Sequence, residues 1–384
     1  MLMKCTNDTI TAAFAGGGTG GHIYPGLAVA GELRKLVEQD GKKIRICWIG
    51  CSSGMDRSLV EKNIDGSGLK SADEFYGIPA GKLRRYFSFR NFLDGFKIIA
   101  GFFASFAVLV RIKPDVLFSK GGFVSVPPCA AAKLLHIPVY THECDFTPGL
   151  ATRLNSKSAK HILLSYKETE LYMKAVYRSK VIVTGNPVRP VFYDASAERG
   201  MRFLGIEQKR KPVLLVLGGS SGARQINELV ADNLDWLCER YVVVHQTGIQ
   251  NANKPAVLRA DYKPFRFIYA EMPDVIAAAD VVLSRAGANS IWECAVLAKP
   301  LVLVPLCGSG TRGDQEDNAR YFENHGAAVV LSRNNATSEK LKQTLENLMS
   351  AEIRSHLSGA CGKLAGETRP AEKIARLLYT ELKG

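Results

Sequence analysis

A short pattern occurs twice in this chain, about half its length apart: an apolar strand, a glycine-rich turn and a helix. The turns read GGGTGGH at 16–22 and GGSSGA at 218–223. Strands are predicted before them at 11–15 and 213–217, and helices after them at 25–38 and 225–233. Because such a unit opens a parallel sheet with crossover helices, the 384 residues are predicted to form an α/β protein of two Rossmann-like domains, their sheets facing each other across an interdomain cleft.

Shorter apolar runs between helical patterns give the remaining strands. They are predicted at 44–49, 116–119, 139–142, 162–165 and 181–184 in the first half, and at 241–245, 267–269, 281–284 and 301–305 in the second. Prolines and charged residues interrupt the pattern over 185–212, which places the domain boundary there. One apolar face of a C-terminal helix is formed by Ile374, Leu377, Leu378 and Leu382. The domains are expected at 1–188, joined by this helix at about 367–384, and at 189–366.

The charge balance and the cysteines limit the classes of partner. A formal net charge of +13 favours a polyanionic partner, which is nucleic acid, anionic lipid or a phosphorylated substrate. The chain has no recognisable RNA- or DNA-binding module, so no nucleic-acid partner is expected. The nine cysteines form no Cys-x-x-Cys motif, which argues against a zinc knuckle or a redox dithiol and is typical of a reducing compartment.

Each glycine loop has two interpretations. Its backbone N–H groups can approach a phosphate closely beside a helix N-terminus, or the loop is only a tight turn between strand and helix. Two matched loops favour the phosphate. The first loop has the spacing Gly-x-Gly-x-x-Gly, but the second strand ends in WIGCS, without the carboxylate that a dehydrogenase needs. His22 and Ile23 exclude a P-loop. Without an Asp-x-Asp triplet for a metal–nucleotide complex, neither a metal nor a cofactor is predicted.

A further nucleotide-binding candidate is the segment 284–293 (SRAGANSIWE), which follows a strand and opens a helix. Asn289 and Ser290 are typical N-cap residues, which places Glu293 in the first helical turn. A carboxylate there can bond both hydroxyls of a ribose, and the alternative is a capping-box glutamate. The polar run 314–319 lies near the end of the next strand, where ligands collect in such sheets.

A basic and aromatic segment precedes an apolar helix in the first half. It interleaves Lys82, Arg84, Arg85 and Arg90 with Tyr86, Phe87, Phe89 and Phe92. The apolar run at 98–110 is shorter than the roughly 20 residues that span a bilayer, and residues 1–11 have no signal-peptide pattern. Basic residues contribute about 1 kcal/mol each near an anionic leaflet. The helix that follows contains Phe102, Phe103 and Phe106. We expect the basic segment to touch a membrane surface and the inner face of this helix to pack in the core.

In their order along nearly the whole chain, these motifs resemble the MurG family of glycosyltransferases. The segments that carry the resemblance are 16–22, 120–127 (KGGFVSVP), 142–143 (HE), 185–189 (GNPVR), 218–224 (GGSSGAR), 285–293 and Gln315 with 318–319. The resemblance implies a GT-B fold. It also implies inverting transfer of N-acetylglucosamine from UDP-N-acetylglucosamine to the C4 hydroxyl of undecaprenyl-pyrophosphoryl-N-acetylmuramyl-pentapeptide, in peptidoglycan synthesis.

The resemblance also implies where the substrates bind. The N-terminal domain would bind the lipid-linked acceptor and an anionic membrane surface, so the protein would lie in the cytoplasm, peripherally on the inner face of the cytoplasmic membrane. The C-terminal domain would bind the UDP-sugar. The implied binding residues are Thr19, Gly20 and Gly21 near the transferred sugar, Arg189 and Ser220 at the diphosphate, Tyr269 at the uracil, Ala288, Asn289, Ser290, Ile291, Trp292 and Glu293 at the diphosphate and ribose, and Gln315 at the sugar hydroxyls.

One position departs from the family pattern. Many members read His-Glu-Gln-Asn where this chain has His142, Glu143, Cys144 and Asp145, so an acidic residue replaces the Asn that touches donor sugar. An inverting displacement needs a base for the acceptor hydroxyl. His22 is the first candidate, since an imidazole titrates near pH ~6.5, and its alternative role is to bond phosphate or backbone. Glu143 and Asp145 are the competing bases.

Two other enzyme classes remain compatible with the two-domain pattern. One is a related GT-B transferase that makes glycolipids, and the other is a sugar-nucleotide epimerase. Neither has the N-terminal segments 16–22 and 120–127, which therefore discriminate against both.

Overall fold

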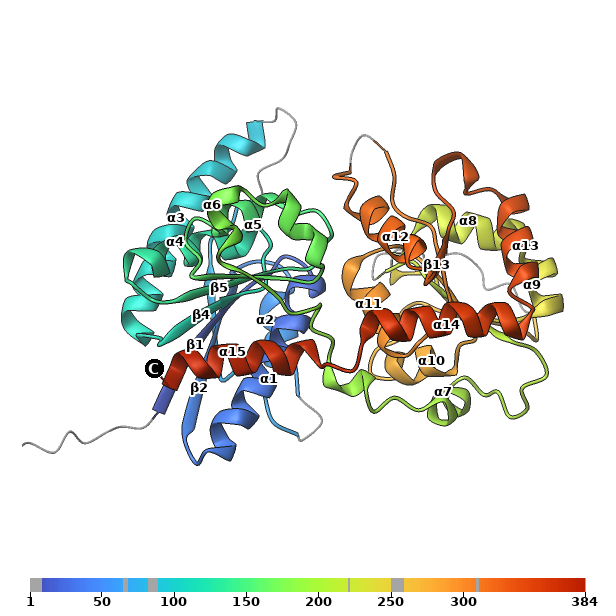
Figure 1. Ribbon diagram of the computed structural model, residues 1–384, viewed down its shortest axis with the longest axis horizontal. Helices are drawn as coiled ribbons and strands as arrows, with labels where there is room; N and C mark the ends of the chain where they lie inside the picture. The colour runs from blue at the N-terminus through green and yellow to red at the C-terminus, as the bar shows by residue number, and fades with distance from the viewer. Residues whose placement is uncertain are drawn as a thin grey trace, which may run out of the picture. The chain divides into compact units, whose positions relative to one another are not determined.

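The computed structural model describes residues 9–64, 68–81, 89–219, 222–249, 259–308 and 311–383, with 89–93 as backbone only. The chain divides into two compact units (Figure 1). Unit 1 comprises Met1–Arg189 and Arg369–Gly384, and unit 2 comprises Pro190–Thr368. Each unit is built on its own parallel sheet, as the two strand–turn–helix patterns predict.

Unit 1 has a seven-stranded sheet in the order β3-β2-β1-β4-β5-β6-β7, in which all neighbours are parallel. The strands are β1 (Thr9–Ala15), β2 (Lys43–Cys51), β3 (Glu74–Ile78), β4 (Val116–Ser119), β5 (Val139–Glu143), β6 (His161–Leu164) and β7 (Val181–Val183). The helices are α1 (Tyr24–Gln39), α2 (Asp56–Glu61), α3 (Phe89–Ile112), α4 (Val126–Leu134), α5 (Leu150–Asn155), α6 (Ala175–Arg178) and α15 (Pro370–Lys383), with 3₁₀ turns at Gly20–His22, Phe123–Ser125 and Lys167–Tyr172.

Alternate residues of β1 fill two different cores, because successive side chains of a strand point to opposite faces. Ala12 and Phe14 belong to the core under α1 and α15, where the ring of Phe14 contacts Trp48 and Phe118. Ala13 and Ala15 belong to the core on the other face, under α3 and α4. Both faces of the sheet are therefore covered, as is usual for parallel sheets.

Unit 2 has a six-stranded parallel sheet in the order β10-β9-β8-β11-β12-β13. The strands are β8 (Val213–Leu217), β9 (Val242–Gln246), β10 (Tyr262–Phe265), β11 (Val281–Ser284), β12 (Leu301–Leu303) and β13 (Ala328–Val330). The helices are α7 (Ala197–Phe203), α8 (Arg224–Asp232), α9 (Leu234–Arg240), α10 (Met272–Ala278), α11 (Ala288–Val296), α12 (Asp314–Asn324), α13 (Ser338–Asn347) and α14 (Ala351–Ala365), with 3₁₀ turns at Pro190–Phe192 and Arg333–Asn335.

The C-terminal helix α15 returns to unit 1 and lies beside α1 (Figure 1). Its predicted apolar face is confirmed, since Ile374 and Leu378 are buried in the core under α1 while Leu377 and Leu382 pack partly against it. Near its end, Glu381 accepts hydrogen bonds from Tyr140 Oη at 2.8 Å and from Lys160 Nζ. These contacts tie the C-terminal helix to β5 and to the residue that precedes β6.

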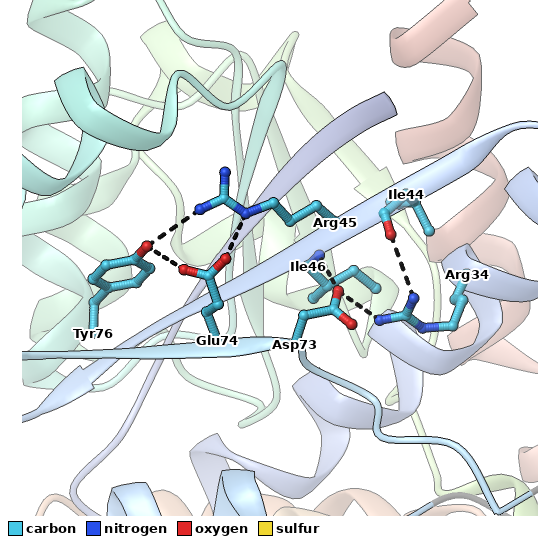
Figure 2. A network of polar contacts seen from close by, with 7 residues as sticks. All are labelled: Arg34, Ile44, Arg45, Ile46, Asp73, Glu74 and Tyr76. Carbon is cyan, nitrogen blue, oxygen red and sulfur yellow. Dashed lines mark hydrogen bonds and ion pairs between the residues drawn. The ribbon is translucent and has the colours of Figure 1, made fainter. Parts of the chain in front are cut away.

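Two expectations about strands are wrong or incomplete. The segment 267–269 is not a strand, because the edge strand β10 ends earlier, at Phe265. The edge strand β3 was missed, and polar contacts hold it and the residue before it to β2 and α1: Arg45 Nε of β2 donates to Glu74 at 2.6 Å, and Arg34 of α1 donates to Asp73 at 2.8 Å (Figure 2). Asp73 also accepts the N–H of Ile46. A strand held by such long-range contacts leaves little local signal.

Helix α3 has one buried and one exposed apolar face. Gly101, Ser105, Leu109 and Ile112 point inward at helical spacing, whereas Phe96, Ile99, Phe103 and Val110 are exposed, Phe103 by 65%. Among the described residues, the stretch Asp94–Ile112 is the one helix long and apolar enough to cross a membrane by length and composition alone. The helix thus extends beyond the short run at 98–110, so the length argument against a span does not apply to it. Buried core helices can have the same length and composition.

Candidate functional site

The first glycine loop leads from β1 into α1 through a 3₁₀ turn at Gly20–His22. Thr19 precedes the turn, and its Oγ1 lies 2.9 Å from Nδ1 of His22. The ring of His22 packs against the backbone of Gly122, where an added Cβ would lie 3.0 Å from the ring. Gly18 (φ 82°) packs in the same way against the ring of Phe123. The loops after β1 and β4 therefore hold each other, with His22 between them.

The strand β5 brings His142 and Glu143 to its carboxyl end, beside Asp145. His142 is fully buried and its Nε2 donates to the carbonyl of Gly185 at 3.0 Å. Burial and then the nearby Lys120 charge hold the pKa of His142 well below its ordinary value, so this ring is neutral at pH 7. His142 is therefore a structural group that holds the backbone at Gly185.

Glu143 is occupied by the turn that follows it. One carboxylate oxygen accepts the N–H of Asp145 at 3.0 Å and the other accepts the N–H of Gly149 at 2.8 Å. A carboxylate that closes a turn in this way has less capacity to take a substrate proton. The present bonds of Glu143 therefore oppose a role as the base.

Glu143, Cys144 and Asp145 form the one group of three potential metal ligands found within the described ranges, their ligand atoms lying within 4.8 Å of one another. A tight turn of consecutive residues explains this proximity. Both oxygens of Glu143 already accept backbone N–H groups, which weakens the cluster as a cation site. Arg189, the last residue of the first segment of unit 1, lies with its guanidinium 5.1 Å from the ring centroid of Tyr24.

In unit 2 the second glycine loop joins β8 to α8. Gly219 (φ 79°) and Gly222 (φ 84°) have left-handed backbone conformations that favour glycine. Ser220 lies outside the described residues. Gly218 packs against the backbone of Ala223, where an added Cβ would lie 2.5 Å from the amide nitrogen. The atoms that come close to Gly218 therefore belong to the protein's own backbone.

The start of α11 differs from the prediction. The helix begins at Ala288 with Gly287 as its N-cap, so Asn289 and Ser290 lie inside the first turn. Glu293 then falls in the second turn, and the capping-box alternative for it is excluded. Ile291 and Trp292 are among the buried residues of the helix, so their side chains pack inside unit 2. The loop before the helix is held by α12, because the side chain of Asn318 donates to the carbonyl of Ala286 at 3.2 Å.

Two side chains organise the loop after β12. The amide Oε1 of Gln315 accepts the N–H of Leu306 at 2.9 Å. Arg285 donates to Gln225 of α8 at 2.8 Å and to the carbonyls of Val304 and Pro305. Arg285 thus joins the second glycine loop's helix to the end of β12. Arg285 belongs to the motif 285–293, which indicates that it lies near the nucleotide site. The sequence around it does not reveal its hydrogen-bond partners.

The uracil candidate Tyr269 is exposed by 69% and packs edge-on against Phe267. The neighbouring Ile268 donates its N–H to the buried side chain of Gln246 at 2.9 Å, which fixes the irregular segment after β10. His245 is part of a packed strand end, since it lies in β9 with Tyr262 and Asn227 as partners, and burial lowers its pKa to about 4.

Comparisons with known proteins agree in both halves of the chain. The glycosyltransferase family 28 N-terminal domain matches residues 12–164, and the family 28 C-terminal domain matches residues 213–362. A curated relative from Treponema denticola is 50% identical, with 98% of this chain and 97% of the relative covered. A relative from Bacillus cereus is 39% identical, with 87% and 90% covered. Both are named UDP-N-acetylglucosamine–N-acetylmuramyl-(pentapeptide) pyrophosphoryl-undecaprenol N-acetylglucosamine transferase, the second with the suffix 2.

Solved structures agree with the fold. The crystal structure of Acinetobacter baumannii MurG is 26% identical with a TM-score of 0.68, covering 97% of this chain and 99% of that one. The UDP-GlcNAc 2-epimerase of Neisseria meningitidis is 14% identical with a TM-score of 0.60, covering 98% and 99%, and this likeness shows the fold alone. The expected GT-B architecture is thus confirmed, and with both family domains in place the chain belongs to glycosyltransferase family 28 and, within it, to the MurG family.

Proposed function

We propose that this chain transfers N-acetylglucosamine from UDP-N-acetylglucosamine to the C4 hydroxyl of undecaprenyl-pyrophosphoryl-N-acetylmuramyl-pentapeptide, with inversion, in peptidoglycan synthesis. The observation that carries the proposal is the 50% identity, over nearly the full length of both chains, to a relative named for this transfer. The buried groups around the first glycine loop and around α11 are consistent with two separate substrate sites.

We assign the UDP-sugar to unit 2. The backbone of Gly219 and Gly222 and the N-terminus of α11 offer N–H groups to a diphosphate, and Glu293 offers a carboxylate for the ribose. Gln315 holds Leu306 with its oxygen, so its amide N–H groups are the part suited to sugar hydroxyls. By resemblance to the family, we also assign Tyr269 to the uracil and Ser220 to the diphosphate.

We assign the lipid-linked acceptor to unit 1, with His22 as the base. The Thr19 contact supports this role because a ring held through Nδ1 presents Nε2 in a fixed direction. Glu143 is the weaker candidate on account of its two backbone bonds. Asp145 remains the third candidate base. We assign substrate binding near the base to Thr19, Gly20, Gly21 and Arg189.

The deciding experiment is an assay with radiolabelled UDP-N-acetylglucosamine and a short-chain lipid-linked muramyl-pentapeptide. The expected result is label in the lipid-linked product, with UDP released in equal amount. Transfer to diacylglycerol instead would overturn the acceptor, and conversion of the nucleotide sugar without an acceptor would indicate an epimerase.

We further propose that unit 1 binds an anionic membrane surface peripherally, from the cytoplasmic side. The exposed face of α3, formed by Phe96, Ile99, Phe103 and Val110, supports this proposal, because an apolar helix face lies well in the boundary between headgroups and acyl chains. The opposite face packs in the unit's core, which favours a helix lying on the surface over one that spans. The basic residues Lys82, Arg84 and Arg85 lie outside the described residues.

Vesicle sedimentation tests the membrane contact. Phe103→Ser is expected to reduce binding to phosphatidylglycerol vesicles by about tenfold, while activity on a soluble short-chain acceptor stays near wild type. Leu171→Ser is the matched control, since Leu171 is 71% exposed but lies on the 3₁₀ turn Lys167–Tyr172 rather than on α3. Equal losses in both variants, or wild-type binding by Phe103→Ser, would contradict the assignment to α3.

A further inference from the structure

A buried carboxylate occupies the first glycine loop. Asp56 is the first residue of α2 and is 1% exposed. Its Oδ1 and Oδ2 accept the N–H of Gly18 at 2.9 and 3.0 Å, and Oδ2 also accepts the N–H of Cys51 at 2.8 Å. The protein therefore places its own anion where a glycine loop of this kind would offer N–H groups to a ligand.

The glycine at position 17 is required by this carboxylate. A Cβ at Gly17 would overlap Oδ2 of Asp56, and it would lie 3.4 Å from the nitrogen of Cys51. Gly50, on β2, has a different cause, because a Cβ there would lie 2.6 Å from the ring of Phe75. Close approach of the backbone to an anion explains Gly17, but the anion is internal.

The ionised form of Asp56 does not stabilise the fold. Burial raises the pKa of Asp56, and the bonds from Cys51 and Gly18 offset this only in part. A carboxyl group whose pKa is raised by folding costs stability when it ionises. Carboxyl groups whose pKa is perturbed by burial cluster at functional sites, which points to a role for Asp56 other than stability.

The contacts of the loop connect Asp56 to the proposed base. Gly18, held by Asp56 on one side and by the ring of Phe123 on the other, immediately precedes Thr19. Thr19 in turn contacts His22 through its side chain, and its carbonyl accepts the N–H of His22 at 3.1 Å. The path from carboxylate to imidazole thus consists of two hydrogen bonds joined by the Gly18–Thr19 peptide bond.

We propose that Asp56 is a positioning residue that fixes the Gly18 backbone so that Thr19 and His22 meet the acceptor hydroxyl in a set direction. The Gly18 N–H is consequently not available to a substrate phosphate, so this part of the loop orients the base and does not bind the diphosphate. The inference rests on the proposed transferase activity.

Steady-state kinetics of Asp56→Asn test it, with Asp115→Asn as the matched control. Asp115 also accepts a backbone N–H, that of Thr11 at 2.8 Å, but at the other end of β1. An Asn side chain keeps the size of Asp56 but turns an NH₂ group toward one of the two N–H donors. The expected result is a kcat lower by ~10–100-fold with KM for UDP-N-acetylglucosamine within twofold, whereas Asp115→Asn keeps the wild-type kcat.

Gly17→Ala is the second variant, in case Asp56→Asn does not fold. It keeps the charge but displaces the carboxylate, so it is expected to lower kcat in the same way. A wild-type kcat in either folded variant, or an equal loss in Asp115→Asn, would overturn the inference. Absence of product from the wild-type enzyme would instead refute the proposed function, so the two failures are distinguishable.

Discussion

Thr19 Oγ1 lies 2.9 Å from Nδ1 of His22, across the 3₁₀ turn that joins β1 to α1. The bond spans three residues and is made by the loop itself, so the ring direction is set before a substrate binds. If Nδ1 carries the proton and donates to Thr19, then Nε2 holds the lone pair with which an imidazole takes a proton.

Removal of this contact is expected to lower turnover without weakening donor binding. Thr19→Ala should reduce kcat by about tenfold, and His22→Ala by ~10²–10⁴-fold, the range for a lost general base. KM for UDP-N-acetylglucosamine should change by less than threefold in both variants. Thr19→Ser, which keeps the hydroxyl, is the control and should retain most of the activity. Near-normal turnover of His22→Ala would remove this residue as the base.

Gln315→Glu separates two roles of one side chain. A Glu at this position keeps an oxygen for the N–H of Leu306 but loses the amide N–H groups that we assign to the sugar. We expect KM for UDP-N-acetylglucosamine to rise about tenfold, which corresponds to about 1.4 kcal/mol, with an unchanged melting temperature. Gln343→Glu, on the exposed face of α13, is the control for the added charge. An unchanged KM in Gln315→Glu would show that this side chain only supports the loop.

The sheets were predictable because their central strands are continuous apolar runs. The strands β4, β8 and β11 have the predicted bounds. The edge strands β3 and β10 contain Glu74 and Pro264, and residues of this kind reduce the strand signal. β3 depends on contacts such as Arg45–Glu74, whose partners are 29 residues apart. Such pairing is a property of the folded chain and not of any local window.

The parts of the site whose backbone is fixed by a sequence motif were predictable. The parts that are fixed by a residue distant in the sequence were less predictable. The loop at 16–22 and its Thr19 and His22 were identified from glycine spacing and resemblance. Asp56 was not, because nothing near it in the sequence indicates that it meets Gly18, 38 residues away. The N-cap of α11 was misplaced by two to three residues, because Gly287 begins the helix without a side-chain cap while Asn318 holds the preceding loop.

The pH dependence of stability should reveal the anchor of α15. Burial tends to raise the pKa of Glu381, but the bonds from Lys160 and Tyr140 outweigh it, so the pKa is lowered. A lowered carboxyl pKa contributes stability above the ordinary value, near pH ~4.3, and the contribution is lost as the pH falls through the folded-state pKa. Glu381→Gln should therefore cost about 1 kcal/mol at pH 7, with the difference from wild type disappearing in acid.

Urea unfolding at a series of pH values measures this difference. Glu372→Gln is the control on the same helix, because Glu372 pairs with Arg376 across one turn at the surface, a contact worth only ~0.3–0.5 kcal/mol. A loss for Glu381→Gln that is the same at pH 7 and in acid would show that the charge of Glu381 contributes nothing.

Replacement by alanine at two helical glycines of unit 2 should change the stability of this unit in opposite directions. At Gly359, in the middle of α14, a Cβ meets nothing within 4 Å in the part of the chain that is described. Gly359→Ala should stabilise unit 2 by ~0.5–1 kcal/mol, since alanine has the higher helix propensity. At Gly200, in α7, a Cβ would overlap the carbonyl oxygen of Asp274, so Gly200→Ala should cost ~1–3 kcal/mol.

Both glycines lie in unit 2, so the unfolding of the same unit reports both changes. The midpoints of urea unfolding should move in opposite directions at an equal slope. The contact of α7 with α10 is fixed by Asp274, which also accepts the N–H of Ser196 at 2.7 Å and two bonds from Arg199. Because these bonds prevent Asp274 from moving away, α7 cannot shift to accept the methyl group. A stabilised Gly200→Ala variant would mean that the two helices separate more easily than these bonds imply.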